Sequence, residues 1–201
     1  MTSSRSEQGQ VRSRPGRPRS EQTRVAVLAA TSELMHEVGV RAMTTEGIAS
    51  RSGASKATIY KWWPNKFAVA VEAFLSEMLA ESPDPDTGSA HEDFRLALRG
   101  LIRFYASSSG RVFAQLVGEA QFDPVIAAEL RDRLVGSRRR LVRAIWDRGV
   151  ARGELRPDAD PEAAIDLVFG PAMYRLVAGH AALDDAAADA IVDAAMRGLA
   201  R

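Results

Sequence analysis

Thr44–Trp63 has the sequence TTEGIASRSGASKATIYKWW and carries more structural information than any other part of the chain. Its pattern predicts two short helices, about 45–52 and 55–62, joined by a tight turn at Gly53. A threonine before the first helix is suited to cap it, because its side-chain oxygen can accept a backbone N–H that the helix leaves unbonded. Paired helices of this kind place the second helix in the major groove of DNA. The stretch therefore favours a DNA-binding regulator over an enzyme.

The second helix divides its side chains between two faces. Ile59 and Trp63 lie one turn apart and are expected to point inward. The opposite stripe combines small, hydroxyl, cationic and aromatic side chains: Ala54, Ala57, Thr58, Lys61 and Trp62. On that stripe Thr58 or Lys61 is suited to a base edge, and Tyr60 beside it to a phosphate oxygen. The alternative is an ordinary core hairpin that buries both tryptophans.

Other polar side chains border this helix and are predicted to contact DNA. Thr44 and Thr45, at the start of the first helix, are expected to hold phosphates. Lys66 is expected to do the same from the first turn of a helix that begins with Pro64, since the free N–H groups there also attract an anion. The remaining candidates are Lys56 and Ser55, the latter equally suited to be a helix cap.

The stretch Gly53–Val69, GASKATIYKWWPNKFAV, resembles the recognition-helix signature of the tetracycline-repressor (TetR) family of bacterial regulators, as does the TTxxIA pattern before it. This resemblance covers residues 21–68. A later segment, Arg152–His180, resembles one type of C-terminal domain in the same family. The resemblance implies an all-helical homodimer whose two recognition helices enter successive major grooves of a palindromic operator. It also implies a small molecule that binds in the C-terminal domain and weakens DNA binding.

From this motif outward, helical periodicity extends over nearly the whole chain and predicts an all-α fold of nine helices without a sheet. The expected helices are about 21–38, 45–52, 55–62, 64–80, 90–108, 110–121, 124–152, 161–179 and 185–200. We expect three parts: a basic arm at 1–20 that is disordered alone, a helix-turn-helix domain at 21–67, and a regulatory and dimerisation domain at 68–201.

Charge is unevenly distributed along the 201 residues, although the formal net charge is only +1. Residues 1–67 contain eleven Lys/Arg and five Asp/Glu, a balance of +6, whereas 68–201 contain sixteen and twenty-one, a balance of −5. This asymmetry is typical of a nucleic-acid module joined to a non-binding domain. An arginine-rich tail explains much of it, but not the three lysines of the chain, which all lie between positions 56 and 66.

Composition and spacing disfavour several other kinds of site. The chain has no cysteine, so it offers no disulfide, thiolate metal site or thiol nucleophile. The three histidines lack metal-ligand spacing, and no phosphate loop or nucleophile elbow stands out. We therefore predict no metal, no cofactor and no enzyme activity. No apolar run is long enough for a bilayer or a secretory signal, which predicts a cytoplasmic protein without membrane contact.

The N-terminal arm contains a candidate minor-groove contact. Arg14, Arg17 and Arg19 lie on a Pro/Gly backbone immediately before the first expected helix. Arginines held in this way can enter the narrow groove of an A·T tract. A solubilising tail is the alternative.

By the same resemblance, aromatic and aliphatic side chains of the middle helices are expected to line a pocket for a small apolar effector. The candidates are Leu98, Leu101, Phe104, Tyr105, Phe113, Leu116, Phe122 and Trp146. An ordinary bundle core is the alternative for any one of them. The triplet Arg138–Arg140 is interpreted as a solvated face of a long helix.

The last two helices carry stripes of small and apolar residues that favour close helix packing in a homodimer. These residues are Ile165, Val168, Ala172, Leu176, Ala188, Ile191, Val192, Ala195 and Leu199. Packing within one chain is the alternative, and Pro171 is expected to kink its helix.

Together these features predict a ligand-responsive repressor that acts as a homodimer on operator DNA. Three alternatives stay open: a transcriptional activator of the same fold, an architectural DNA-binding protein, and a helical small-molecule-binding protein or enzyme.

Overall fold

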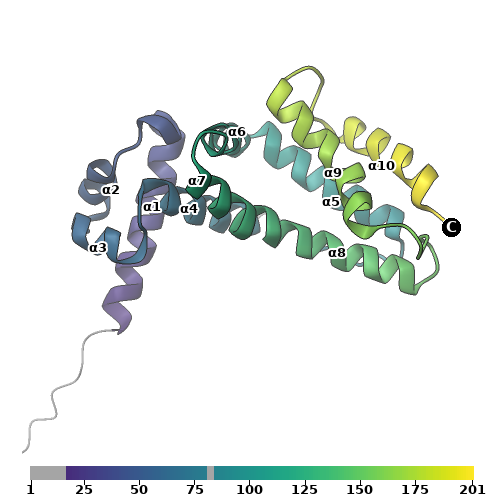
Figure 1. Cartoon of the computed structure of the whole chain (residues 1–201), viewed down its shortest axis with the longest axis horizontal. Helices are drawn as coiled ribbons and strands as arrows, with labels where there is room; N and C mark the ends of the chain where they lie inside the picture. The colour runs from purple at the N-terminus through teal and green to yellow at the C-terminus, as the bar shows by residue number, and fades with distance from the viewer. Residues whose placement is uncertain (1–16, 81–83) are drawn as a thin grey trace, which may run out of the picture.

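The computed structural model describes residues 17–80 and 84–201, and both ranges are almost entirely helical (Figure 1). The N-terminal helices are α1 (Arg17–Ala42), α2 (Thr45–Ser52), α3 (Lys56–Trp62) and α4 (Lys66–Ala80). The others are α5 (Ala90–Ala106), α6 (Ser108–Ala120), α7 (Pro124–Glu129), the π-helical turn η1 (Leu130–Val135), α8 (Gly136–Ala151), α9 (Pro161–Ala178) and α10 (Asp185–Leu199).

The predicted all-α fold is confirmed. With α7, η1 and α8 counted as one continuous rod, the described ranges contain nine helices and no strand, only an isolated bridge between Leu155 and Ala200. Each predicted helix is present, with ends shifted by a few residues. Within these ranges no helix is both long enough and apolar enough to span a bilayer.

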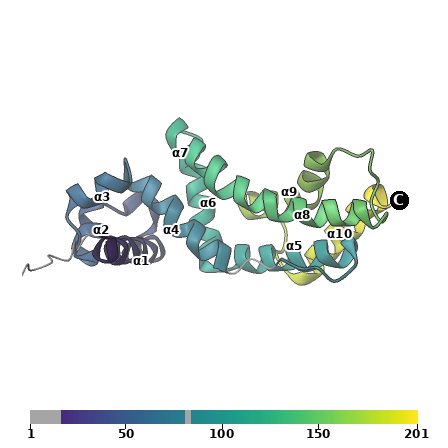
Figure 2. The same ribbon diagram turned by 90° about the horizontal axis from the view of Figure 1, so that it is seen from below.

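Helix α4 joins the two ends of the molecule (Figures 1 and 2). Helices α1–α3 form one end and α5, α9 and α10 the other, while α4 extends from the first towards the second. Every residue from Ala68 to Phe74 is buried, because α4 packs on α1 on one side and on α6, α7 and η1 on the other. The buried side chains of both ends consequently form a single hydrophobic core.

Glycines interrupt α1 and end α2. Gly39 interrupts α1 with φ 83° and ψ 161°, a backbone conformation that side-chain-bearing residues rarely adopt. Directly after this break, the Val40 N–H donates to Oε1 of Gln115 on α6 (2.8 Å). Gly53 ends α2 in the left-handed region, with φ 69°. The break at Gly39 thus also fixes α1 against the C-terminal helices.

Helix α4 begins at Lys66, so the prediction that it starts with Pro64 is wrong. Asn65 is its cap, since the Asn65 Oδ1 accepts the N–H groups of Phe67 and Ala68, each at 2.9 Å. Trp63 has an extended backbone (φ −131°, ψ 126°), as expected before a proline. Pro64 therefore belongs to the connection between α3 and α4.

Two irregularities mark the C-terminal helices. Helix α9 continues through Pro171, the residue that is predicted to kink it. The rod α7–η1–α8 contains a π-helical turn in which the Gly136 N–H bonds to the carbonyl of Arg131, five residues back. The sequence predicts this rod as one regular helix, and nothing in its hydrophobic pattern announces the π turn.

Candidate nucleic-acid interface and effector cavity

The side chains of α3 divide between inside and outside largely as predicted. Ile59 and Trp63 are buried, while five neighbours are exposed: Ser55, Lys56, Ala57, Tyr60 and Lys61. Trp62 is half-buried, and its ring meets that of Trp63 edge-on. Ala54 was expected on the outer stripe and is instead buried, because it lies in the turn before α3.

Ser55 and Thr58 form a hydroxyl pair at the start of α3. The Ser55 Oγ accepts the Thr58 N–H (3.1 Å) and lies 2.9 Å from the Thr58 Oγ1. Ser55 is thus the helix cap, which was one of its two predicted roles. Because the Thr58 hydroxyl lies against Ser55, its methyl group is the part better suited to an apolar contact, such as a thymine methyl.

The three lysines have different surroundings. Lys56 pairs with Glu46 on α2 (2.7 Å). Lys66, predicted to bind a phosphate, donates to the carbonyls of Arg41 and Met43 at the end of α1, each at 2.8 Å. A cation there is favoured because the last carbonyls of a helix carry partial negative charge. Within residues 17–80 and 84–201, Lys61 has no ion-pair or hydrogen-bond partner, so its ammonium is available to DNA.

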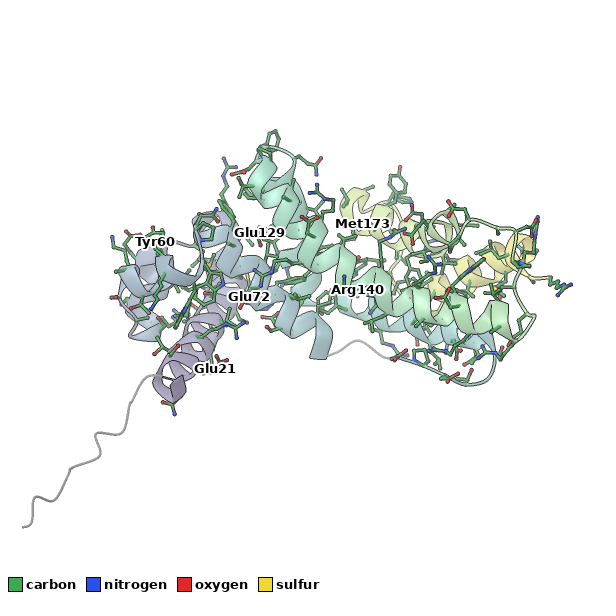
Figure 3. The ribbon with its side chains drawn as sticks, turned by 60° about the horizontal axis from the view of Figure 1, so that its bottom comes forward. Glu21, Tyr60, Glu72, Glu129, Arg140 and Met173 are labelled. Atoms are coloured by element: carbon green, nitrogen blue, oxygen red, sulfur yellow. The ribbon has the colours of Figure 1, made fainter. Side chains whose placement is uncertain are left out.

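The predicted threonine contacts are partly engaged within the protein. The Thr44 Oγ1 caps α2 by accepting the Gly47 N–H (3.0 Å), and the residue is exposed. Thr45 is buried, and the Tyr60 hydroxyl lies 3.5 Å from its Oγ1. The Tyr60 side chain nonetheless stays half exposed at the end of the molecule that carries α3 (Figure 3). Tyr60 therefore combines a fixed orientation with access to solvent.

The arginines of the N-terminal arm are only partly within the structure. Arg14 lies outside the described residues. Arg17 and Arg19 belong to the first turn of α1, which begins earlier than the predicted start at residue 21.

Glu72 on α4 connects three other elements. Its carboxylate accepts hydrogen bonds from Arg24 on α1, from Arg133 on η1, and from the indole Nε1 of Trp63 at the end of α3 (3.0 Å). The side chain is only 10% exposed, whereas those of Arg24 and Arg133 are 40% and 37% exposed. Figure 3 places Glu72 between the DNA-binding end and the long rod. We call these four residues the Glu72 cluster.

The Glu72 cluster keeps its carboxylate charged. Burial alone would raise the pKa of Glu72, but hydrogen bonds from Arg133 and Trp63 and the charges of Arg133 and Arg24 outweigh it. The pKa of Glu72 is therefore held below its ordinary value. The sequence does not reveal this cluster, because its members are separated by up to about a hundred positions and only the fold brings them together.

A cavity of about 240 Å³ lies among α4, α5, α6, η1, α8 and α9. Three predicted effector residues line it: Leu101, Tyr105 and Phe113. The remaining lining is Met78, Leu134, Val135, Arg138, Arg139, Val142, Ile165, Asp166, Phe169, Gly170 and Met173. Leu134 and Val135 directly follow Arg133 of the Glu72 cluster, so the cavity wall and the cluster share the turn η1.

The other predicted pocket residues lie elsewhere. Leu98, Phe104, Leu116 and Trp146 are buried in the hydrophobic core and do not line the cavity. Phe122 is 90% exposed, because it lies in the short connection between α6 and α7. Aromatic content alone could not separate core from cavity, since both are apolar.

Arg138 differs most clearly from its predicted position. It was interpreted as part of a solvated charge run, but it is partly buried and lines the cavity. A signal was present: Leu134, Arg138 and Val142 follow one another at four-residue steps and share one helix face. Arg139 faces α9, where Glu162 and Asp166 bind it.

The stripes predicted to form a dimer interface pack mostly inside one chain. Seven of the residues are buried in the monomer, against α5 and each other: Ile165, Val168, Ala172, Ala188, Val192, Ala195 and Leu199. Leu176 and Ile191 are partly buried against the same core, and Ile165 also lines the cavity. The large apolar residues that α9 exposes are Leu167, Tyr174 and Val177, at 51%, 65% and 59%. Periodicity identified a buried face, but not which partner buries it.

Two family models match the chain. The model "Bacterial regulatory proteins, tetR family" matches residues 27–73, and "Tetracyclin repressor-like, C-terminal domain" matches residues 84–195. The HTH-type transcriptional regulator YdeS of Bacillus subtilis is 41% identical over 92% of this chain and 93% of its own length. The chain therefore belongs to the TetR family of transcriptional regulators, whose members bind DNA operators.

Solved structures agree with this assignment. The TetR-family regulator SCO0332 is similar, with a TM-score of 0.79 and 32% identity over 88% of this chain and 98% of that one. FadR from Bacillus subtilis, whose structure is in complex with stearoyl-CoA, shares the fold with a TM-score of 0.67 at 18% identity, over 87% and 98% of the two chains. The predicted DNA-binding regulator is thus confirmed.

Proposed function

We propose that this protein is a cytoplasmic, ligand-responsive repressor that acts as a homodimer on a palindromic operator. The observation that carries the proposal is the outward face of α3, where Tyr60 and Lys61 are exposed while Ile59 and Trp63 fix the helix to the core. Repression is the simpler mode of action, because a bound dimer that covers a promoter needs no further contact with the polymerase. Activation from another operator position is the alternative.

Selection of bound fragments from a random duplex library tests operator binding directly. We expect an inverted repeat whose half-sites are separated by about one helical turn, roughly 34 Å. Fragments without a shared sequence would instead favour an architectural DNA-binding protein.

The homodimer is proposed to form through the exposed side of α9 and the neighbouring side of α10. Leu167, Tyr174 and Val177 recur at seven- and three-residue steps on α9, and α10, which packs on α9, exposes Ala186 and Ala190. Bulky residues on one helix and small ones on the next suit a close four-helix contact. Exposed apolar side chains concentrated on one helix are more typical of an interface than of a solvated surface.

Ligand control is proposed to pass through η1. A molecule in the cavity contacts Leu134 and Val135, while the adjacent Arg133 binds Glu72. Glu72 in turn holds Trp63 at the end of the recognition helix. A shift of η1 would therefore alter the position of α3, and small displacements of that helix impair simultaneous docking in two grooves.

Replacement of Lys61 by alanine should change the sequence preference of the protein. Lys61 is exposed on the outer face of α3, so we expect it to contact a base edge and to favour one base pair by about 1–3 kcal/mol. Binding of Lys61→Ala to operators substituted one position at a time measures this, with Lys66→Ala as the comparison. Two of the three N–H groups of the Lys66 ammonium bind the Arg41 and Met43 carbonyls, and we propose that the third binds a phosphate. Lys66→Ala should therefore weaken all operators alike and reduce the slope of log affinity against log salt by about one unit. Equal weakening of every operator by Lys61→Ala would assign Lys61 to a phosphate instead.

A further inference from the structure

The cavity is mostly apolar, and the protein itself engages the charged groups of its wall. Most of the lining consists of aliphatic, methionine and aromatic side chains. Arg139 binds the carboxylates of Glu162 and Asp166. Arg138 donates from Nη2 to the Ala97 carbonyl (3.1 Å). A charged molecule would have to compete with these partners after losing its own hydration, so the cavity favours an uncharged ligand.

Tyr105 supplies the cavity with a polar group that the protein does not use. The residue lines the cavity and is only 7% exposed. Within residues 17–80 and 84–201, its hydroxyl has no hydrogen-bond partner. Burial of a hydroxyl without a partner is unfavourable. A hydrogen-bond acceptor on a bound molecule would remove this penalty.

The Tyr105 hydroxyl is a donor with a fixed direction. Burial raises the pKa of Tyr105, and the nearby Arg138 only partly opposes this effect, so the hydroxyl is protonated at neutral pH. The Tyr105 ring stacks on Phe113, with 5.5 Å between centroids, and its centroid lies 6.3 Å from that of Phe104. Because two aromatic neighbours restrain the ring, the hydroxyl can select a ligand that carries its acceptor at a matching position.

We propose that the effector is an uncharged, mainly apolar ring compound whose carbonyl oxygen accepts a hydrogen bond from the Tyr105 hydroxyl. Its ring would contact the apolar wall, which includes Leu101, Ile165 and Met173. A cavity of about 150 Å³ holds one benzene ring, so about 240 Å³ suits a substituted ring or two fused rings. This inference rests on the proposed function, because it identifies the ligand class of the proposed effector site.

Calorimetric titration of the full chain with acetophenone and with α-methylstyrene tests the proposal. The two probes have the same shape, but α-methylstyrene carries a CH₂ group in place of the carbonyl oxygen and accepts no hydrogen bond. Because water solvates the ketone better, the affinity ratio of the two probes is compared between the unmodified protein and Tyr105→Phe, which lacks only the hydroxyl. We expect this ratio to fall about two- to tenfold in Tyr105→Phe, the range of one neutral hydrogen bond. The affinity for α-methylstyrene should stay unchanged and is the internal control.

Infrared spectroscopy of bound acetophenone is an independent readout. A carbonyl that accepts a hydrogen bond absorbs at a lower frequency than the same carbonyl in an alkane solvent. We expect this lower frequency in the unmodified protein and an alkane-like frequency in Tyr105→Phe. The measurement on the unmodified protein decides the question even if Tyr105→Phe fails to fold. An alkane-like frequency there, failure to bind either probe, or an unchanged affinity ratio in folded Tyr105→Phe would overturn the proposal.

Benzoate distinguishes a charged from an uncharged ligand. We expect it to bind more weakly than acetophenone, because the protein already engages the charged side chains of the wall. Tighter binding of benzoate would overturn the proposed ligand class. Operator binding is measured separately: a protein that binds its operator but does not distinguish the probes refutes only the ligand class. A protein that binds acetophenone through Tyr105 but binds no operator refutes the proposed function and leaves this site in place.

Discussion

A Tyr174→Asp variant is expected to be monomeric and to lose most of its operator affinity. Tyr174 lies in the middle of the exposed apolar stripe of α9, between Leu167 and Val177. In the proposed dimer, the new carboxylate would be buried against an apolar surface without a partner, which is strongly unfavourable. A monomer can occupy only one half-site, so affinity should fall on the order of a hundredfold or more.

Molar mass from light scattering and operator affinity from fluorescence anisotropy are the two measurements. Phe122→Asp is the matched control, because it also replaces an exposed aromatic by a charge, but on the connection between α6 and α7. It should stay dimeric and bind DNA normally. A Tyr174→Asp protein that keeps a dimer's mass would place the interface elsewhere.

Loss of the charge on Glu72 should be the most destabilising polar change in the molecule. Glu72→Gln would leave the guanidiniums of Arg24 and Arg133 without their shared carboxylate and weaken the bond to Trp63. Breaking a fully buried ion pair costs about 3–5 kcal/mol, but these arginines are partly exposed, so about 2 kcal/mol is expected. For a chain of this size that is a decrease in Tm of roughly 4–8 °C.

Glu129→Gln is the control for Glu72→Gln. Glu129 also pairs with Arg133 (3.4 Å), but within residues 17–80 and 84–201 it has no ion pair or hydrogen bond with α1 or α3. Its loss should therefore change Tm little and leave operator binding intact. Comparable decreases in Tm for the two variants would mean that Arg133 alone, not the link to Arg24 and Trp63, carries the effect.

The same carboxylate predicts a pH dependence. Because the pKa of Glu72 is lowered in the folded protein, its stabilising contribution is complete above its ordinary pKa of 4.5. This contribution is lost as the pH falls through the lower, folded value. The difference in Tm between the unmodified protein and Glu72→Gln should thus be constant near neutral pH and shrink below about pH 4.5.

Local signals in the sequence were sufficient for the helix-turn-helix. The caps Thr44 and Ser55 and the turn glycine Gly53 act within a few residues, and each has its predicted role. Ala54 was misplaced because helical periodicity was extended into the turn. Lys66 was expected to hold a phosphate, and its bonds to the Arg41 and Met43 carbonyls could not be predicted, because those residues lie more than twenty positions earlier.

Features that depend on tertiary contacts could not be predicted. The apolar stripe of α9 that includes Val168 and Ala172 is buried by α5 of the same chain, and periodicity does not identify the partner. The exposed side of α9, which carries Tyr174, has fewer apolar residues than the buried side, so its hydrophobic periodicity in the sequence is weaker. The same limit explains Arg138: it belongs to a run of three arginines in the sequence, whereas its neighbours in space include Phe169 and Tyr105.

The π-helical turn sets the angular relation between the two halves of the long rod. Each α-helical residue advances the side-chain direction by about 100°, and a π turn accommodates one residue more than an α turn. The turn between Leu130 and Val135 absorbs one residue, so a regular α-helix of the same sequence would rotate everything after the turn by about that angle. Arg133 lies within the turn and Arg138 after it, so no regular helix of this sequence could aim both as they are now. The chain thus depends on one surplus residue to direct one arginine at the DNA-binding end and the other at the cavity.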